Sequence, residues 1–425
     1  MTKVITYGTY DLLHYGHRLL LERAKALGDY LIVGITSDDY DRTRGKINAY
    51  QPLMERIEAV KKLGIADEII VEEYEGQKID DIRRLGVDVF TVGSDWVGYF
   101  DYLKEYCQVV YLPRTEGVSS SEIRAERRML KLGIYGNSRV AGKYEAECAF
   151  VNGMSFVGKC ATDDGYAALL PNCDAVYIQS HPRDHLRHIR QALESGKHVL
   201  CESPIALSGN DCKGLFALAA EKGLVLMDAI KTAYSTAYNR MLLLIKSGKI
   251  GEVMSVDATC TSLMPPYSSV EELTAQWNAR QAWAPAALLA VLQILGCDYE
   301  ECRAIPFYAK GAEDFDIFTK YDFKYKSAVG TVKVGKGVKS EGELIVSGSK
   351  GYIYVPAPWW KTDYFEIRYE NPVDNRRHFY QLFGEGIRNE LVVFARSIVL
   401  GGAGNIRQTE SEIISELMTV KYDRR

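Results

Sequence analysis

The first 112 residues alternate between short apolar runs and amphipathic stretches, which is the pattern of a parallel sheet with crossover helices. The apolar runs are rich in β-branched residues and predict buried strands at residues 4–6, 30–36, 69–71, 88–93 and 109–112. Apolar residues at helical spacing predict helices over residues 18–27, from residue 54 and over residues 77–85. Ligands of such sheets bind at the carboxyl ends of the strands, so polar residues directly after each strand are candidate site residues.

Two histidines follow the first predicted strand directly. The strand ends in the turn residues Gly8, Thr9, Tyr10 and Asp11. His14 and His17 then open the next helix, and their spacing puts both imidazoles on one face of its first turn. Gly16 between them lets a ligand come close, and a helix start favours an anion. The pattern indicates a phosphate site, whereas a single histidine here would be interpreted as a helix cap.

The stretch from Gly8 to His17 resembles the His-x-Gly-His signature of the nucleotidyltransferase superfamily. Residues 114–121 resemble the Arg-Thr-x-Gly-Ile-Ser-Thr-Thr motif of cytidylyltransferases, and residues 1–127 are similar to the glycerol-3-phosphate branch of that family. The resemblance implies transfer of CMP from CTP to a small polyol phosphate, giving CDP-glycerol for a wall or capsule polymer. It also implies Mg²⁺ on the triphosphate and a homodimer. Enzymes for choline and ethanolamine phosphate share both motifs, so the acceptor stays open.

The resemblance assigns roles to individual residues. Those implied to carry catalysis by holding phosphate oxygens are His14, His17, Lys46 and Arg114. Arg56 would bind the acceptor's phosphate with its planar fork. Those implied to contact the nucleotide are Gly8, Thr9, Tyr10, Asp11, Asp95, Trp96, Thr115, Gly117, Ser119, Ser120 and Ser121. A solvated charged loop is the alternative for Lys46, and a packed turn is the alternative for Trp96.

The second part of the chain begins with another strand and a glycine turn. Residues 136–141, 173–185 and 192–204 resemble the Gfo/Idh/MocA family of NAD(P)-dependent sugar and polyol oxidoreductases. This resemblance implies a Rossmann-like half, followed by an α+β half built on a mostly antiparallel sheet. The predicted domains are therefore residues 1–128, 129–232 and 233–425, with a helix expected over residues 119–131.

Four departures from the oxidoreductase pattern bear on its activity. The second glycine of the dinucleotide turn is Ser138, and Ser203 replaces the catalytic lysine of the family's Glu-Lys-Pro. Residues 160–174 leave no room for the usual helix and strand, and residues 282–287 place alanines where the family offers an aspartate and a histidine or tyrosine. The candidate dinucleotide contacts are Gly136, Ser138, Glu202 and His185. The departures favour a fold kept for assembly or sensing, and an NAD(P)-dependent polyol or sugar oxidoreductase remains the alternative.

Composition excludes several classes of function. A net charge of −4 leaves no basic footprint for nucleic acid, and no apolar run is long enough to span a bilayer. The nine cysteines form no Cys-x-x-Cys pair, which argues against a zinc site and indicates reduced thiols in a cytoplasmic protein. His181 and His185 are four residues apart, but without a carboxylate at zinc spacing we expect satisfied surface histidines and no protein metal site.

Overall fold

The computed structural model describes residues 1–37, 51, 53–74, 76–113, 129–151, 153–380, 382–401 and 404–420. The chain forms two compact units, Met1–Met129 and Leu130–Arg425. The further division expected at residue 232 lies within the second unit and stays a prediction. The helix expected over residues 119–131 is wrong at its end, because Leu130 pairs with Met154 at the start of a strand.

The first unit is built on a five-stranded parallel sheet with the strand order β3-β2-β1-β4-β5. Its strands are β1 (Lys3–Gly8), β2 (Tyr30–Thr36), β3 (Glu68–Glu72), β4 (Val89–Gly93) and β5 (Gln108–Leu112). From the central β1 the chain builds outward to β2 and β3 on one side, and then to β4 and β5 on the other. The strand order therefore reverses between β1 and β4, and such a switch point is where α/β sheets bind ligands.

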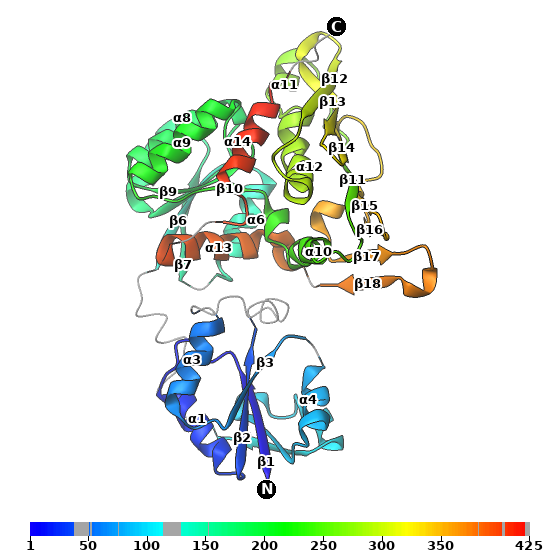
Figure 1. The fold of residues 1–425 in the computed structure, drawn as a ribbon. Helices are drawn as coiled ribbons and strands as arrows, with labels where there is room; N and C mark the ends of the chain where they lie inside the picture. Colours follow the sequence, from blue (N-terminus) through cyan, green and yellow to red (C-terminus); the bar gives the residue numbers. More distant parts are fainter. Residues whose placement is uncertain are drawn as a thin grey trace. The chain divides into compact units, whose positions relative to one another are not determined.

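Helices cover both faces of this sheet (Figure 1). Helices α1 (Tyr15–Lys25) and α3 (Leu53–Leu63) pack on one face, where Leu31 of β2 joins their apolar cluster. Helix α4 (Gln77–Leu85) packs on the other face with Ile32 of β2. Successive strand residues point to opposite faces, so burial on both sides requires the continuous apolar runs that predict these strands. Two 3₁₀ helices follow β4, η1 (Ser94–Trp96) and η2 (Asp101–Glu105).

The second unit begins with another five-stranded parallel sheet, ordered β10-β9-β8-β6-β7. Its strands are β6 (Leu130–Tyr135), β7 (Met154–Cys160), β8 (Ala175–Ile178), β9 (His198–Glu202) and β10 (Leu226–Ala229). The apolar residues of one face pack with α7 (Asp163–Leu169), α8 (Pro182–Glu194) and α9 (Gly209–Glu221). The other face carries α6 (Arg139–Cys148), which packs with α13 (Ile387–Leu400).

The connection between β7 and β8 corrects one expectation. Residues 160–174 are too short for the usual helix and strand together, but a helix alone fits there, as the seven-residue α7 and the 3₁₀ helix η3 (Leu170–Asn172) show. Thr162 makes this short helix viable, because its side chain caps the helix by accepting a hydrogen bond from the N–H of Gly165 at 3.2 Å. In the described part of the chain, the strand that follows is β8 itself.

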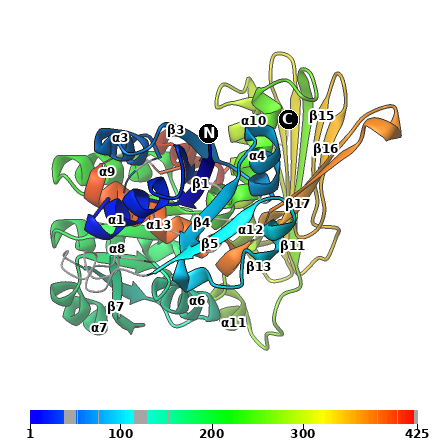
Figure 2. The ribbon, with the colours of Figure 1, turned by 90° about the horizontal axis from the view of Figure 1, so that it is seen from below.

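The second unit ends in an eight-stranded sheet ordered β12-β13-β14-β11-β15-β16-β17-β18, in which only β11 and β14 pair in parallel. Its strands are β11 (Val253–Ser262), β12 (Glu301–Ala309), β13 (Ala312–Lys324), β14 (Val329–Lys336), β15 (Leu344–Gly348), β16 (Tyr352–Val355), β17 (Tyr364–Arg368) and β18 (Arg376–Phe379). Helix α12 packs against β11, β13 and β14, on the same side of the sheet as α10 (Figure 2). The mostly antiparallel sheet is the one predicted from the sequence.

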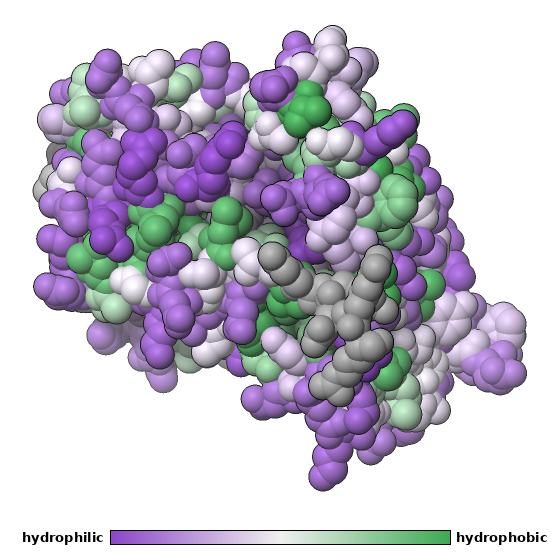
Figure 3. Space-filling view, turned by 90° about the horizontal axis from the view of Figure 1, so that it is seen from above, coloured by the Kyte–Doolittle hydropathy of each residue, from purple (hydrophilic) through white to green (hydrophobic). Residues whose placement is uncertain are grey.

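The remaining helices connect this sheet to its surroundings. They are η4 (Lys231–Tyr234), α10 (Thr236–Lys246), α11 (Val270–Thr274), α12 (Ala279–Leu295), η5 (Trp359–Lys361), η6 (Pro372–Asp374), η7 (Phe383–Gly386) and α14 (Gln408–Leu417). Helix α14 packs against both α9 and α12 and so ties the two sheets of the second unit together. On the face of the molecule in Figure 3, hydrophilic residues predominate and hydrophobic residues form separate small patches. None of the helices described has the length and apolarity that crossing a bilayer requires.

Candidate functional site

The loop between β1 and α1 is fixed by buried side chains. Asp11 is 2% exposed, and its Oδ1 accepts a hydrogen bond from the N–H of Gln51 at 3.0 Å. The Oε1 of Gln51 in turn accepts a hydrogen bond from the N–H of Leu12 at 2.9 Å. Tyr10 and Leu12 have left-handed backbone conformations, with φ of 50° and 47°. This conformation costs a non-glycine residue about 1–2 kcal/mol, so these contacts hold a strained loop at the carboxyl end of β1.

His14 and His17 come together at the first turn of α1. His14 is the N-cap residue, and its Nδ1 accepts a hydrogen bond from the N–H of Gly16 at 3.1 Å. The two imidazole rings stack with centroids 3.8 Å apart, and the ring of Tyr10 packs edge-on against His17 at 5.6 Å. His14 therefore caps α1 and also stacks on His17, so the two interpretations do not exclude each other. The pair lies at a helix start, where the dipole favours an anion.

Arg56 of α3 is completely buried, and its guanidinium donates to backbone carbonyls. Nη1 donates to the carbonyl oxygens of Thr9 at 2.7 Å and Thr36 at 2.8 Å, and Nε donates to that of Gln51 at 3.0 Å. These bonds join the loop after β1, the end of β2 and the start of α3. These contacts give Arg56 a positioning role, and its predicted contact with the acceptor's phosphate stays a prediction.

Asp95 and Trp96 lie in η1, directly after the strand that neighbours β1. Asp95 is exposed, and the ring of Trp96 packs 5.3 Å from that of Tyr99 and 5.8 Å from that of Phe100. This packing agrees with the packed-turn alternative, and the nucleotide contact stays a prediction. The other predicted residues lie outside the described part of the chain, and they are Lys46, Arg114, Thr115, Gly117, Ser119, Ser120 and Ser121.

A buried polar network supports the same edge of the sheet. Lys78 of α4 forms an ion pair with Glu72 at the end of β3, and Glu72 also accepts a hydrogen bond from the hydroxyl of Thr36 at 3.0 Å. The hydroxyl of Tyr7 donates to Asp81 at 2.9 Å, and burial together with this carboxylate raises the pKa of Tyr7, which keeps the hydroxyl protonated. The sequence pattern carries a signal for this network, because Lys78 and Asp81 fall on the buried face of the predicted helix.

In the second unit, the turn between β6 and α6 is closed by its own side chains. Ser138 is the N-cap residue of α6, and its Oγ accepts hydrogen bonds from the N–H groups of Val140 at 3.1 Å and Ala141 at 3.2 Å. The same hydroxyl donates to Oε1 of Gln179 at 2.7 Å. Gln179 also lies against Gly136, whose φ is 151° and where an added Cβ would come within 3.0 Å of Oε1. The start of α6 is thus already capped from within the chain.

Asp163, the acid nearest the end of β7, is held by three side chains. It accepts hydrogen bonds from Arg187 at 2.7 Å, from His188 Nε2 at 3.0 Å and from the hydroxyl of Tyr135 at 3.3 Å. The bonds from Arg187 and His188 lower the pKa of Asp163 to about 2. The Nδ1 of His188 is 2.8 Å from the hydroxyl of Ser180. This carboxylate therefore belongs to an internal network that joins β6, α7 and α8.

Glu202 is partly buried and His185 is fully buried in the second unit. The hydroxyl of Tyr177 donates to Glu202 Oε1 at 2.7 Å, and burial raises the pKa of Glu202. His185 is 0% exposed, with Nδ1 2.8 Å from the carbonyl oxygen of Pro204 and Nε2 3.0 Å from that of Ser180. The expectation of a surface histidine is wrong, because α8 turns this ring toward the loop after β9. Burial lowers the pKa of His185 to about 4.

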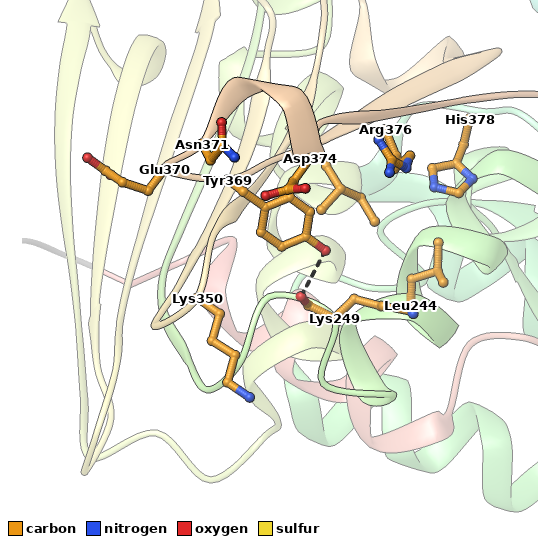
Figure 4. Close-up of a pocket in the computed structure, with 10 residues that line it drawn as sticks. Leu244, Lys249, Lys350, Tyr369, Glu370, Asn371, Asp374, Arg376 and His378 are labelled. Atoms are coloured by element: carbon orange, nitrogen blue, oxygen red, sulfur yellow. Dashed lines mark hydrogen bonds between the residues drawn. The ribbon is translucent and has the colours of Figure 1, made fainter.

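An open pocket of about 660 Å³ lies beside the hairpin of β17 and β18 (Figure 4). The hydroxyl of Tyr369 crosses it and donates to the carbonyl oxygen of Lys249 at 3.2 Å. Its lining mixes cations such as Lys350 and Arg376 with the carboxylates of Glu370 and Asp374. This balance of charge favours no single class of ligand.

Comparison with known proteins distinguishes the same two parts of the chain. The family model described as Cytidylyltransferase-like matches residues 5–126. Glycerol-3-phosphate cytidylyltransferase of Bacillus spizizenii is 48% identical over 130 residues, which are 31% of this chain and 100% of that protein. The chain belongs to the cytidylyltransferase family. The enzyme of the same name from Staphylococcus aureus is 48% identical over 126 residues, 30% of this chain and 95% of that protein. The cytidylyltransferase unit, residues 1–129, is a nucleotidyltransferase.

The second unit of this cytidylyltransferase-family chain matches a different group. The model described as Oxidoreductase family, NAD-binding Rossmann fold, covers residues 138–229. A solved 3-ketoreductase from Actinomadura kijaniata, in complex with TDP-benzene and NADP, has a TM-score of 0.60 and 19% identity, covering 68% of this chain and 96% of that chain. This likeness shows the fold of a Gfo/Idh/MocA oxidoreductase.

The residues of the second unit fit a nicotinamide dinucleotide poorly. A pyrophosphate at a Rossmann turn binds to the helix start, but Ser138 already accepts from two N–H groups there. Asp163, the acid after β7 that could bind a ribose hydroxyl, is occupied by three donors. Ser203 supplies no ammonium at the position of the family's lysine.

The described residues contain no group of three or more His, Cys, Asp or Glu side chains that could hold a metal ion. His181 caps α8 by accepting from the N–H of Arg183. All nine cysteines are free thiols, and five of them are buried.

Proposed function

We propose that the cytidylyltransferase unit transfers CMP from CTP to glycerol 3-phosphate and releases CDP-glycerol and pyrophosphate. The observation that carries this proposal is the stacked pair His14 and His17 at the start of α1, at the switch point of the sheet. Similarity over the full length of a glycerol-3-phosphate cytidylyltransferase supports glycerol 3-phosphate as the acceptor. We further infer that the product serves a wall or capsule polymer and that the reaction takes place in the cytoplasm, where free thiols persist.

The chemistry requires positioning and charge stabilisation. A phosphate oxygen of the acceptor attacks the α-phosphorus in line, and pyrophosphate leaves from the opposite side. This oxygen is already anionic, so no general base is needed, and catalysis rests on orientation and on donors aimed at the developing charge. His14 and His17 would donate to the α-phosphoryl oxygens. Mg²⁺ bound to the triphosphate would neutralise charge on the leaving group. Arg56 would keep the loop that carries both histidines in place.

Pyrophosphate release with CTP and Mg²⁺ over a panel of acceptors tests this proposal. The panel contains sn-glycerol 3-phosphate, glycerol 2-phosphate, ribitol 5-phosphate and phosphocholine. We expect release with glycerol 3-phosphate and its loss in His17→Ala. Release with another acceptor alone would keep the reaction and overturn the substrate, and no release with any acceptor would overturn the proposal.

An NAD(P)-dependent oxidoreductase activity of the second unit is the second candidate, favoured by the match over residues 138–229. We infer that the unit transfers no hydride, because Ser138 caps its own helix and Ser203 stands at the position of the lysine. Titration of the full-length chain with NADPH, followed by cofactor fluorescence, tests this inference. No binding at millimolar NADPH is expected, and saturable binding with oxidation of NADPH to NADP⁺, coupled to reduction of a keto group on a polyol or sugar precursor, would overturn it.

A further inference from the structure

Three lysines from separate parts of the second unit converge on one carboxylate. Lys143 of α6 contacts Glu385 Oε1 at 2.6 Å, and Lys361 of η5 contacts the same oxygen at 3.0 Å. Lys231, the first residue of η4, contacts Oε2 at 2.9 Å. The lysine side chains are 22–35% exposed and that of Glu385 is 31% exposed, so solvent and solutes reach the cluster. Lys143 and Lys231 lie in helices that follow strands of the parallel sheet, whereas Lys361 lies between β16 and β17 of the eight-stranded sheet.

The charges around this trilysine cluster do not balance. Besides the three lysines, Arg388 is nearby and is paired with Glu147 at 2.7 Å. Glu390 also faces Lys231, but burial raises its pKa well above the ordinary value and keeps it neutral. The four cations are the three lysines and Arg388. If Glu202 beside Lys231 is counted as ionised, the described carboxylates that face them are Glu385, Glu147 and Glu202. Within the described part of the chain the cations of this cluster outnumber its ionised carboxylates by at least one, and such an excess of positive charge attracts an anion with more than one charge.

Glu385 is presented by a short loop in an unusual backbone conformation. Gly384, Glu385 and Gly386 have φ values of 55°, 54° and 88°, so three successive residues are left-handed. Glycine is needed on both sides, because an added Cβ would come within 2.4 Å of the Glu147 carboxyl group at Gly384 and within 2.8 Å of the Lys231 carbonyl at Gly386. Only Glu385 bears the cost of a left-handed residue with a side chain, about 1–2 kcal/mol. Its bonds to the lysines offset that cost.

We propose that Lys143, Lys231 and Lys361 form a binding site for a phosphate group, and that the Glu385 carboxylate is an internal competitor which the phosphate displaces. A phosphate dianion offers three oxygens and two charges to three ammonium groups, whereas the carboxylate offers two oxygens and one charge. Lys231 follows the carboxyl end of β10, and ligands of such folds bind at that edge of the sheet. It is independent of the proposed cytidylyltransferase reaction.

Titration calorimetry of the full-length chain with inorganic phosphate at low ionic strength tests the proposal. In Glu385→Gln the competitor is neutral, so we expect phosphate to bind at least tenfold more tightly than in the unchanged chain. Glu366→Gln is the matched control, because Glu366 also accepts from two cations, Arg368 and Arg377, and its loss changes the net charge equally. Equal affinity in Glu385→Gln and the unchanged chain, or an equal gain in Glu366→Gln, would overturn the proposal.

Two further arms keep the test decisive if Glu385→Gln does not fold. In the unchanged chain, phosphate should slow acetylation of Lys143, Lys231 and Lys361 at least threefold and leave Lys249 unaffected. Equal rates at all four lysines would reject the site. Methyl phosphate as a second titrant distinguishes the source, because a site for phosphomonoesters responds to both compounds and a site for free phosphate responds to inorganic phosphate alone.

Discussion

Arg56→Lys separates the positioning role of this side chain from a direct contact with the acceptor. The buried guanidinium donates to three carbonyl oxygens, those of Thr9, Thr36 and Gln51. A lysine keeps the charge but reaches one of these carbonyls, so two bonds from a charged donor are lost. At about 1.5 kcal/mol each, the first unit should lose about 3 kcal/mol, a factor of about 150 in its unfolding equilibrium.

Hydrogen exchange of the full-length chain measures this loss where it occurs. Amides of β1 and β2 exchange through unfolding of the whole unit, so their exchange should become about 100-fold faster. We also expect kcat/KM to fall for CTP and the acceptor alike, because the loop carrying both histidines loosens. The matched control is Arg18→Lys, whose solvent-exposed ion pair with Glu22 contributes little to stability. Exchange that changes less than threefold, with a raised KM for the acceptor alone, would refute the positioning role.

Three further predictions concern single side chains. His17→Ala should lower kcat about 100-fold or more with CTP still bound, whereas Tyr15→Phe on the same turn should not, and retention of a tenth of the rate would contradict the role of His17. Burial raises the pKa of Asp228 to about 7, so the free energy of unfolding falls as pH rises from about 4 to 7. In urea titrations Asp228→Asn should therefore stabilise the second unit by up to about 4 kcal/mol at pH 8 and by little at pH 4. Burial lowers the pKa of His185 to about 4, so the free energy of unfolding should fall by up to about 3 kcal/mol as pH falls from 6.5 to 4. An equal fall over the same pH range in His185→Gln would contradict this assignment.

The sequence predicts the local part of this structure well. The strand and helix positions of the first unit follow from apolar periodicity, and the mostly antiparallel last sheet follows from the family resemblance. The pairing of His14 and His17 is also local, because helical spacing alone brings residues three apart onto one face. Residues of the second motif lie outside the described chain and stay predictions.

The remaining features depend on contacts between distant residues, which periodicity does not encode. Tyr144 and Glu390 are 246 positions apart and meet in the core, and Lys143 and Glu385 are 242 positions apart. The burial of His185 also depends on a distant contact, because the loop after β9 covers its ring near the start of α8. The short helix α7 escaped prediction because its seven residues are fewer than a periodic pattern needs.

The most direct test of the central claim is to follow the reaction of the full-length chain with CTP, Mg²⁺ and sn-glycerol 3-phosphate by ³¹P NMR. The account predicts that the triphosphate and monoester signals are replaced by those of CDP-glycerol and pyrophosphate in equal amounts, and that His17→Ala leaves the starting signals in place. Intact CTP after prolonged incubation, or its hydrolysis without incorporation of the acceptor, would contradict it.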